Sequence, residues 1–299
     1  MKGPDFFIVG APKCGTTSLA RYLAQHPRVF MCEPKEPFFF GTDLTGGSHW
    51  SRQQYEAMFA RSGDLVCGEA TTWYLYSKTA AKAIHRFNPE ARIVIMLRNP
   101  VDAAHSLYGQ LRFNQDEDIE DFAAAIEAQE RRRRGQDIPD RCRAPWALQY
   151  TDVCRFAGQV QRYLETFGRR QVRFVIFDDF EARPANEVRL VYDFLGVDPG
   201  FRPDMRVLNR SKRPRSRRLQ RLLIDAPTHL LGRLLVPPRL RPAVAGLALR
   251  LNSRPAPRPP LPPKVRADLA ELFQDDVRKL GDLLGRDLMH WCRDRATTT

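Results

Sequence analysis

A short apolar run near the start of the chain, Phe6 to Gly10, leads into a loop of small and polar residues. The loop reads Gly-Ala-Pro-Lys-Cys-Gly-Thr-Thr over residues 10–17, and after it Leu19 and Leu23 follow helical spacing. A buried strand, a glycine-containing loop and a helix in this order form the start of a strand–helix unit. Because the first N–H groups of a helix lack internal acceptors, such a loop is an anion site.

Two later segments have the same strand character, and each is followed by a predicted helix. Residues 91–98 form an apolar run, and Asn99 behind it supplies a helix N-cap residue before a proline. Residues 172–177 are a third apolar run, followed by helical spacing over 185–195. Strands that alternate with helices predict an α/β fold of the P-loop type, with three layers and a central, mostly parallel sheet flanked by helices.

The loop over residues 10–17 resembles a Walker A loop but differs from it at one position. In a Walker A loop a lysine follows the second glycine and reaches the β- and γ-phosphates of ATP. Here Thr16 follows Gly15, and the lysine stands earlier, at Lys13. The loop therefore predicts a phosphate site that disfavours ATP hydrolysis, and a P-loop nucleotide kinase-like enzyme is the alternative.

The chain of 299 residues carries a net charge of +13, and the excess lies in one late segment. Between residues 206 and 266 there are 16 Lys and Arg residues against one acid, Asp225. The basic, proline-containing part at 206–263 favours an anionic partner. Its alternatives are a solvated face on packed helices, an acceptor lid, and a peripheral membrane contact for a lipid-linked acceptor. The run of arginines at 131–134 is interpreted as a solvated helix end.

Other patterns set the organisation and exclude several classes of protein. Helical spacing over 264–284 ends near Gly285, and one domain is predicted over residues 1–299. A basic protein that binds nucleic acid or a membrane surface is the second alternative function. No recognised nucleic-acid motif accompanies the basic segment, so nucleic acid is a disfavoured partner. The six cysteines lack zinc-ligand spacing, which predicts no metal site and reduced thiols in a cytoplasmic protein. There is no signal-peptide pattern, and no apolar stretch reaches the roughly 18 residues of a spanning helix.

Four segments together resemble the sulfotransferases that use 3′-phosphoadenosine 5′-phosphosulfate (PAPS). The resemblance is closer to the heparan sulfate type and its bacterial relatives than to the steroid and phenol type. It covers about residues 5–290. The segments are residues 12–19, His26-Pro27 with Lys35 to Phe40, Leu97 to Pro100 with Ser106 and Tyr108, and residues 155–164 with 172–195. This family implies sulfuryl transfer from PAPS as co-substrate, with no metal, to a hydroxyl of a carbohydrate, lipid or small molecule, or alternatively to an amine.

The resemblance implies a donor site in three parts. The loop would hold the 5′-phosphosulfate, while an arginine and a hydroxyl near the second strand, together with the late basic segment, would hold the 3′-phosphate. The predicted donor residues are Lys13, Cys14, Gly15, Thr16 and Thr17 in the loop, Arg98 and Ser106 near the second strand, and one or two among Arg210, Lys212, Arg213 and Arg215. Lys13 is also predicted to be catalytic, because it can offset charge or donate a proton at the leaving bisphosphate.

Glu36 is the predicted catalytic base, because it matches the glutamate that serves as base in the heparan sulfate members. Its neighbours from Pro37 to Phe40 predict apolar surroundings for the carboxyl group. The alternative is a surface carboxylate paired with Lys35. Three histidines are rival bases, of which the first is interpreted as a structural helix-end residue: His26, His49 and His105.

One later segment departs from the heparan sulfate pattern. Those members usually have a lysine after a glutamate where this chain reads Glu69-Ala70. The missing cation argues against a highly sulfated glycan as acceptor. Glu69 and Thr72 remain candidates to line the cleft, and Trp73 and Tyr74 are interpreted as core rather than as a sugar platform.

Overall fold

The computed structural model describes residues 3–205, 212–214, 252–255 and 260–293. The chain forms two compact units. The first consists of Met1–Leu107, Gln149–Leu208 and Pro262–Thr299, and the second of Tyr108–Leu148 and Asn209–Leu261. The sequence-based expectations for Arg210, Arg215 and the stretch 219–251 lie outside the described residues. One domain over the whole chain stays a prediction.

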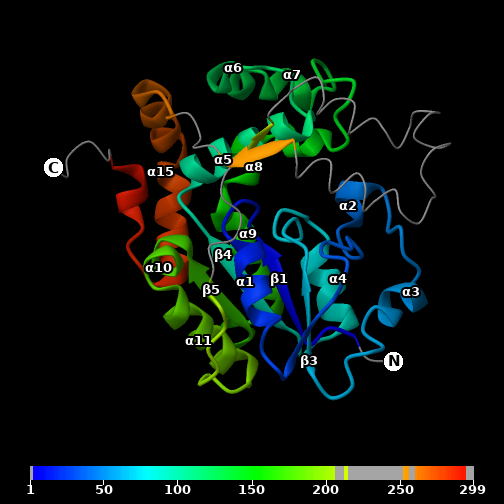
Figure 1. Cartoon of the computed structure of the whole chain (residues 1–299). Helices are drawn as coiled ribbons and strands as arrows, with labels where there is room; N and C mark the ends of the chain where they lie inside the picture. Colours follow the sequence, from blue (N-terminus) through cyan, green and yellow to red (C-terminus); the bar gives the residue numbers. More distant parts are fainter. Residues whose placement is uncertain (1–2, 206–211, 215–251, 256–259, 294–299) are drawn as a thin grey trace. The chain divides into compact units, whose positions relative to one another are not determined.

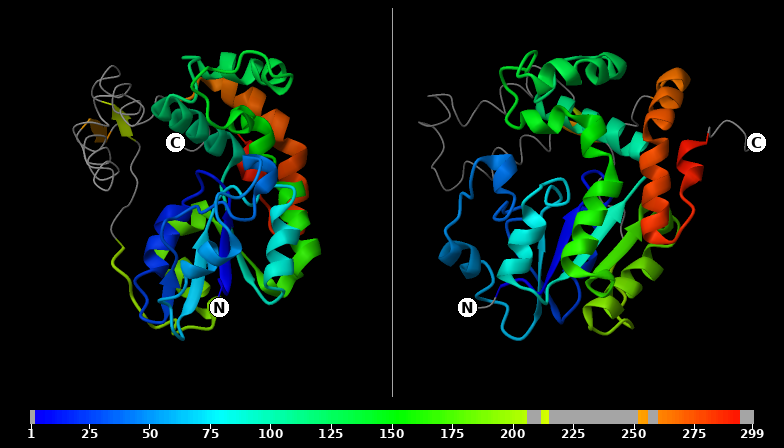
Figure 2. Two further views of the ribbon diagram at one scale, coloured as in Figure 1. Left: turned by 90° about the vertical axis from the view of Figure 1, so that its right-hand side faces the viewer. Right: turned by 180° about the vertical axis from the view of Figure 1, so that it is seen from behind.

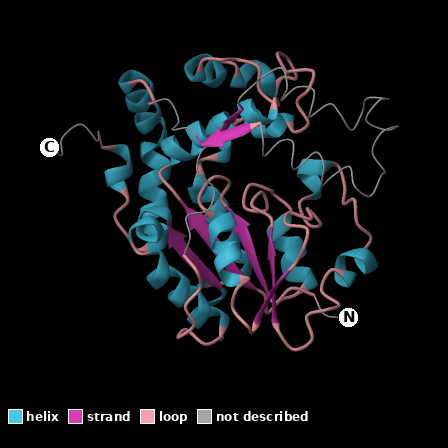
Figure 3. Ribbon diagram, in the orientation of Figure 1, coloured by secondary structure: helices cyan, strands magenta, loops and turns pink. Residues whose placement is uncertain are grey.

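Five parallel strands form the sheet of the first unit, in the order β2-β3-β1-β4-β5 (Figure 3). The strands are β1 (Phe6–Gly10), β2 (Val29–Met31), β3 (Val66–Ala70), β4 (Arg92–Leu97) and β5 (Val172–Ile176). The three strands predicted from apolar runs are confirmed as β1, β4 and β5. Parallel strands covered on both faces are apolar throughout, which is why these three could be read from the sequence.

Helices cover both faces of this sheet, so the predicted three-layer α/β fold is confirmed (Figures 1 and 2). One face carries α1 (Thr16–Leu23) and α11 (Pro184–Leu195), which pack together. The other carries α4 (Ala80–Phe87), α9 (Phe156–Phe167) and α15 (Pro263–Leu284), with α9 against both others. The predicted last helix is α15, and it ends at Gly285, whose φ of 67° is the left-handed conformation common at helix ends.

The remaining elements are short or belong to the second unit. In the first unit they are α2 (Thr42–Thr45), α3 (Arg52–Ala57), α8 (Tyr150–Val153), α10 (Phe177–Ala182) and the 3₁₀ helices η2 (Arg169–Gln171) and η3 (Met289–Cys292). Helix α5 (Pro100–Asn114) begins in the first unit and ends in the second. The second unit also contains α6 (Phe122–Glu127), α7 (Gln129–Arg133), η1 (Pro145–Leu148) and an antiparallel pair, β6 (Lys212–Pro214) with β7 (Ser253–Pro255).

A buried ion pair in the second unit corrects the interpretation of the arginine run. The side chain of Arg132 is 1% exposed and that of Glu117 is 0% exposed. Two hydrogen bonds join them, of 2.6 Å from Nη1 to Oε2 and 2.8 Å from Nη2 to Oε1. The prediction of a solvated helix end is therefore wrong for Arg132. It fits Arg133 and Arg134, which are exposed and pair with Glu130.

All six cysteines lie within the described ranges, and none is disulfide-bonded. Among the helices of the described ranges, none combines the length and the apolar character needed to cross a bilayer. In the same part of the chain, no three His, Cys, Asp or Glu side chains gather as a metal site would require.

Candidate functional site

The segments singled out from the sequence follow the ends of successive strands of the sheet. Loop 11–15 follows β1, Glu36 follows β2, Thr72 follows β3 and Arg98 follows β4. Because all strands run in the same direction, these segments meet at one edge, where ligands of open α/β sheets bind. The sheet therefore brings four motifs that are far apart in the sequence to the same end of its strands.

The loop after β1 is tightly held and presents free N–H groups. Gly10 sits so close to the segment after β3 that a Cβ on it would lie 2.5 Å from Leu75 Cβ. Gly15 caps α1 with a φ of 93°. Within the described part of the chain, the backbone N–H groups of Gly15, Thr16 and Thr17 have no hydrogen-bond acceptor. Three such groups at a helix start fit an anionic phosphate.

The side chain of Cys14 supports this loop from the protein interior. It is fully buried, and its Sγ lies 3.5 Å from the carbonyl oxygen of Pro12. Burial raises the pKa of the Cys14 thiol to about 12, although the nearby charge and backbone N–H of Arg98 oppose the shift. The thiol is therefore neutral near pH 7, and Cys14 serves the predicted loop by packing.

Arg98 lies beside the same loop. Its guanidinium carbon is 4.4 Å from the ring centre of Phe177, at the start of α10. A Cβ on Gly15 would lie 3.1 Å from the same ring. No described carboxylate pairs with Arg98, so its N–H donors remain available for a phosphate. Ser106, the second residue predicted for the 3′-phosphate, is buried at 3% exposure on α5.

Glu36 has one carboxylate oxygen held and the other open. Oε1 accepts hydrogen bonds from Lys35 Nζ at 2.6 Å and from Thr72 Oγ1 at 3.0 Å. Among the described residues Oε2 has no partner. The Lys35 ion pair, offered above as the alternative to a base, is thus present and still leaves Oε2 open. The backbone of Glu36 has a φ of 62°, a strained conformation for a residue other than glycine.

The carboxyl group of Glu36 is partly exposed, and the apolar surroundings predicted for it stay a prediction. Its side chain is 30% exposed, and the phenylalanines after it face other partners. Phe39 stacks on Tyr55 with ring centres 4.1 Å apart, and Phe40 packs on Phe7 of β1. Between them and β2 lies a turn in which Glu36 and Phe38 both have positive φ values.

The end of β3 contains a buried carboxyl that the sequence only offered as a cleft candidate. Glu69 is 0% exposed. Its carboxylate accepts hydrogen bonds from the hydroxyls of Tyr55 and Thr71. Tyr55 was missed altogether, because no pattern links a tyrosine on α3 to an acid at the end of β3. Tyr74 is fully buried, as its interpretation as core predicted, while Trp73 is half-buried.

The rival histidines lie in different settings. His26 is buried between α1 and β2, at the opposite edge of the sheet from Glu36. Its Nδ1 accepts the N–H of Arg28 at 3.0 Å, and its Nε2 lies 3.1 Å from the carbonyl oxygen of Asp198. This fits the structural role predicted for it. His49 is exposed, and His105 is half-buried on α5.

The donor residues predicted in the basic segment belong to the second unit. Lys212 and Arg213 lie on β6, opposite Pro255 and Arg254 of β7. Their backbone is described and their side chains are not, so their contact with a donor stays a prediction, as it does for Arg215.

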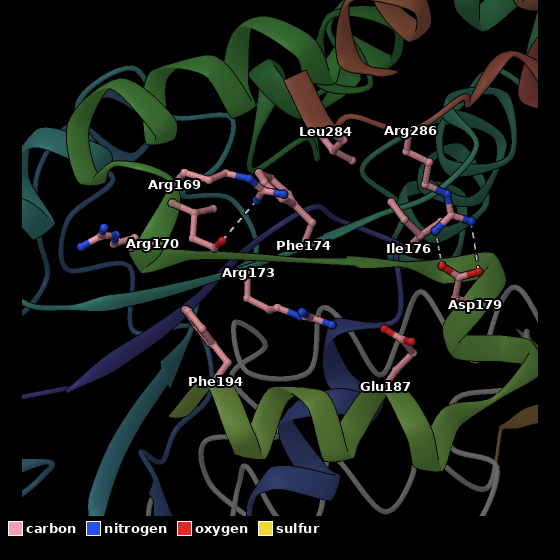
Figure 4. Close-up of a pocket in the computed structure, with 11 residues that line it drawn as sticks. Arg169, Arg170, Arg173, Phe174, Ile176, Asp179, Glu187, Phe194, Leu284 and Arg286 are labelled. Atoms are coloured by element: carbon pink, nitrogen blue, oxygen red, sulfur yellow. Dashed lines mark hydrogen bonds and ion pairs between the residues drawn. The ribbon is translucent and has the colours of Figure 1, made fainter. Parts of the chain in front are cut away.

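Two cavities of the first unit lie away from the predicted residues. One, of about 420 Å³, runs along β5 and contains arginines and acids (Figure 4). In Figure 4, Arg286 pairs with Asp179 above the strand while Arg173 and Glu187 point into the space below it. The other, of about 500 Å³, is lined by phenylalanines and arginines that include Phe87 and Arg52. Neither is lined by the loop after β1, by Arg98 or by Glu36.

Comparison with known proteins agrees with this arrangement. A family model described as a sulfotransferase domain matches residues 3–207. The crystal structure of a sulfotransferase from Alicyclobacillus acidocaldarius matches 98% of this chain and 100% of its own, with a TM-score of 0.73 and 30% identity. Mouse sulfotransferase SULT7A1, solved in complex with PAP, shares the fold at 16% identity and a TM-score of 0.51, over 95% of this chain and 88% of its own.

A relative with a named reaction is similar over part of its length. Human heparan sulfate glucosamine 3-O-sulfotransferase 6 is 29% identical over 195 residues, which are 65% of this chain and 52% of the human protein. The chain thus spans about half the length of this curated relative. The family model covers most of the chain, and the bacterial structure matches it nearly from end to end. On this evidence the chain belongs to the sulfotransferase family.

Proposed function

We propose that this protein transfers a sulfuryl group from PAPS to a hydroxyl group of a carbohydrate or another small molecule. The observation that carries the proposal is that Gly15 and Arg98 both lie beside the ring of Phe177. It supports a site for a nucleotide with phosphates on both sides of its ribose, held by the loop after β1 and by an arginine that pairs with no carboxylate among the described residues.

The donor residues divide by the group that they would hold. The N–H groups of Gly15, Thr16 and Thr17, with the two threonine hydroxyls, suit the 5′-phosphate. Arg98, with Ser106 on the next helix, suits the 3′-phosphate, and Lys212, Arg213 or Arg215 would add to it. Lys13 extends from the same loop with a backbone φ of 65° and would stabilise the negative charge that gathers on the leaving group.

When bound, PAPS supplies the sulfuryl group and is left as the bisphosphate PAP. Glu36 Oε2 accepts the proton of the acceptor hydroxyl, whose oxygen then bonds to sulfur as the bond from sulfur to the 5′-phosphate oxygen breaks. Lys35 and Thr72 hold Oε1, which directs Oε2 to the acceptor. The chain's own residues thus position the reactants and offset charge, the pattern known for phosphoryl transfer.

The acceptor is proposed from chemistry and from the named relative together. The human relative is a heparan sulfate enzyme, which supports a carbohydrate hydroxyl. Ala70 stands where the heparan sulfate members have a lysine, so we propose an acceptor with fewer sulfate groups. An amine or a lipid-linked hydroxyl is the alternative acceptor group. We also propose a cytoplasmic location for the protein.

A thermal-shift titration tests the donor assignment. PAP should raise the melting temperature more than 5′-AMP or ATP with magnesium at equal concentration, because only PAP presents both phosphates to the loop and to Arg98. Arg98→Ala should abolish the preference for PAP over 5′-AMP. Arg92→Ala, an exposed arginine at the other end of β4, is the matched control and should retain it. A preference for ATP with magnesium would contradict the proposal.

A further inference from the structure

A carboxyl group lies buried three residues before Thr72 of the candidate site. Glu69 is the fourth residue of β3 and is 0% exposed. Each of its oxygens accepts a hydrogen bond from a hydroxyl group. Oε2 accepts from Tyr55, and Oε1 accepts from Thr71 at 2.6 Å. Burying a carboxyl is costly unless its oxygens are hydrogen-bonded, and here both are. Since no part of the side chain reaches solvent, Glu69 cannot touch an acceptor.

The chain just after Glu69 holds Glu36 at two points. The carbonyl oxygen of Ala70 accepts the backbone N–H of Glu36 at 3.1 Å. The hydroxyl of Thr72 donates to the Glu36 carboxylate at 3.0 Å. These two contacts come from the residues on either side of Thr71, the residue whose hydroxyl is bound to Glu69. A shift of Thr71 would therefore move both the contact to the Glu36 backbone and the Thr72 contact to its carboxylate.

Tyr55 fixes Glu69 from a third element. It lies on α3 and is fully buried. Its ring is stacked on Phe39, three residues after Glu36, with ring planes 4° apart. The N–H of Phe39 in turn donates to the hydroxyl of Tyr74 at 2.9 Å. The loop that carries Glu36 is thus tied to Glu69 through Tyr55 as well as through Thr72.

Helix α9 holds the end of the segment that follows Glu69. Arg162 on α9 donates to the carbonyl oxygens of Leu75 at 3.2 Å and Ser77 at 2.8 Å. The segment from Glu69 to Ser77 is therefore fixed at both ends. Side chains that support a catalytic group in this way hold it within the fraction of an ångström that turnover requires.

We propose that Glu69 is a positioning residue for the catalytic base: its carboxylate, locked by Tyr55, holds Thr71 and so the Thr72 hydroxyl that directs Glu36. This inference rests on the proposed function, in which Glu36 is the base. Burial raises the pKa of Glu69 to about 7, although the hydrogen bonds from Thr71 and Tyr55 oppose the shift.

Two isosteric variants and one control test the inference. Glu69→Gln and Tyr55→Phe keep the packing and remove the charge or a single hydroxyl. Tyr192→Phe removes an equally buried hydroxyl, which donates to the Tyr22 carbonyl oxygen far from Glu36. Turnover is measured with ³⁵S-labelled PAPS, with chemically desulfated heparan sulfate as the probe acceptor, and with water as acceptor through release of inorganic sulfate. We expect kcat to fall roughly 10- to 100-fold in the first two variants, with unchanged PAP binding, and to stay within about twofold in Tyr192→Phe.

A double-variant cycle separates positioning from an independent effect. If Glu69 acts through Glu36, adding Glu69→Gln to Glu36→Gln should cause no further loss. Losses that multiply would overturn the inference. Crystal structures of Glu69→Gln and Tyr55→Phe decide the same point without turnover. The distance from Thr72 Oγ1 to Glu36 Oε1 should lengthen beyond hydrogen-bonding range in both, and a retained 3.0 Å in both would refute positioning.

The two proposals fail in different ways. If Glu36→Gln lowers turnover but Glu69→Gln and Tyr55→Phe do not, the positioning role is wrong and the function stands. If Glu36→Gln leaves transfer unchanged, or PAP does not bind, the proposed function itself is wrong.

Discussion

The hydroxyl of Thr72 donates a hydrogen bond to the carboxylate of Glu36, with 3.0 Å between Thr72 Oγ1 and Glu36 Oε1. Lys35 binds the same oxygen. A carboxylate held in this way by one oxygen keeps a fixed direction and offers the other to a reacting hydroxyl. The bond also joins the segments that follow β2 and β3, which are neighbouring strands.

Replacing Glu36 by glutamine should remove turnover and leave donor binding intact. Glutamine keeps the shape of the side chain but cannot accept a proton, so we expect a fall of roughly 10²- to 10⁴-fold in kcat. The affinity for PAP, measured by calorimetry, should be unchanged. Glu33→Gln, an exposed acid in the same loop, is the control and should keep full activity. Normal turnover in Glu36→Gln would disprove the assignment.

A methyl group at Gly15 should weaken both folding and PAP binding. Gly15 has a φ of 93°, where a side chain costs about 1–2 kcal/mol. The new Cβ would also lie 3.1 Å from Phe177 and 3.2 Å from Met96. Urea denaturation should show the loss of stability, and titration with PAP a reduced affinity. Gly158 lies on an exposed side of α9, and an added Cβ there has no neighbour within 4 Å. Gly158→Ala should therefore lower neither the stability nor the affinity for PAP. An unchanged PAP affinity in Gly15→Ala would argue against the loop as donor site.

The buried carboxyl of Glu69 should make the protein less stable as pH rises. Burial raises its pKa from 4.5 to about 7, with a further rise from the charge of Glu36, so the folded protein keeps a proton that the unfolded chain loses above about pH 4.5. Stability therefore falls between about pH 4.5 and 7, by about 3 kcal/mol at about 1.36 kcal/mol per pKa unit. Urea denaturation of Glu69→Gln should show that fall reduced by this amount. Curves that stay parallel to those of the wild type would show that Glu69 titrates normally.

Two adjacent arginines of the second unit should differ sharply in their effect on stability. Arg132→Ala leaves the buried carboxylate of Glu117 unpaired, which should cost about 3–5 kcal/mol of unfolding free energy. Arg133→Ala removes an exposed ion pair and should change it by less than about 1 kcal/mol. Chemical denaturation measures both, and equal effects would contradict the burial of Arg132.

What could be read from the sequence follows from how each element is stabilised. The strands at Phe6–Gly10, Arg92–Leu97 and Val172–Ile176 are apolar runs because helices cover the sheet on both faces, and that signal is local. Strand β3 contains Gly68 and Glu69 and has no such run. It was therefore missed, although the sheet needs it between β2 and β1.

The candidate site also contains parts that the sequence reveals and parts that it does not. The loop at residues 10–17 and Arg98 are short motifs whose chemistry is visible in the sequence. The link from Tyr55 to Glu69 joins residues 14 positions apart on different elements, and no periodicity marks it. The burial of Arg132 was hidden for a similar reason, because three of the four arginines in its run belong to the surface.

One ring, Phe177, lies against both Gly15 and Arg98. In the proposed function these two residues bind opposite ends of the nucleotide. The same ring therefore supports the residue that binds the 5′-phosphate and the residue that recognises the 3′-phosphate. A smaller side chain at this position would loosen both at once. A substitution of Phe177 should consequently change the affinity for the donor and the selectivity for the bisphosphate together.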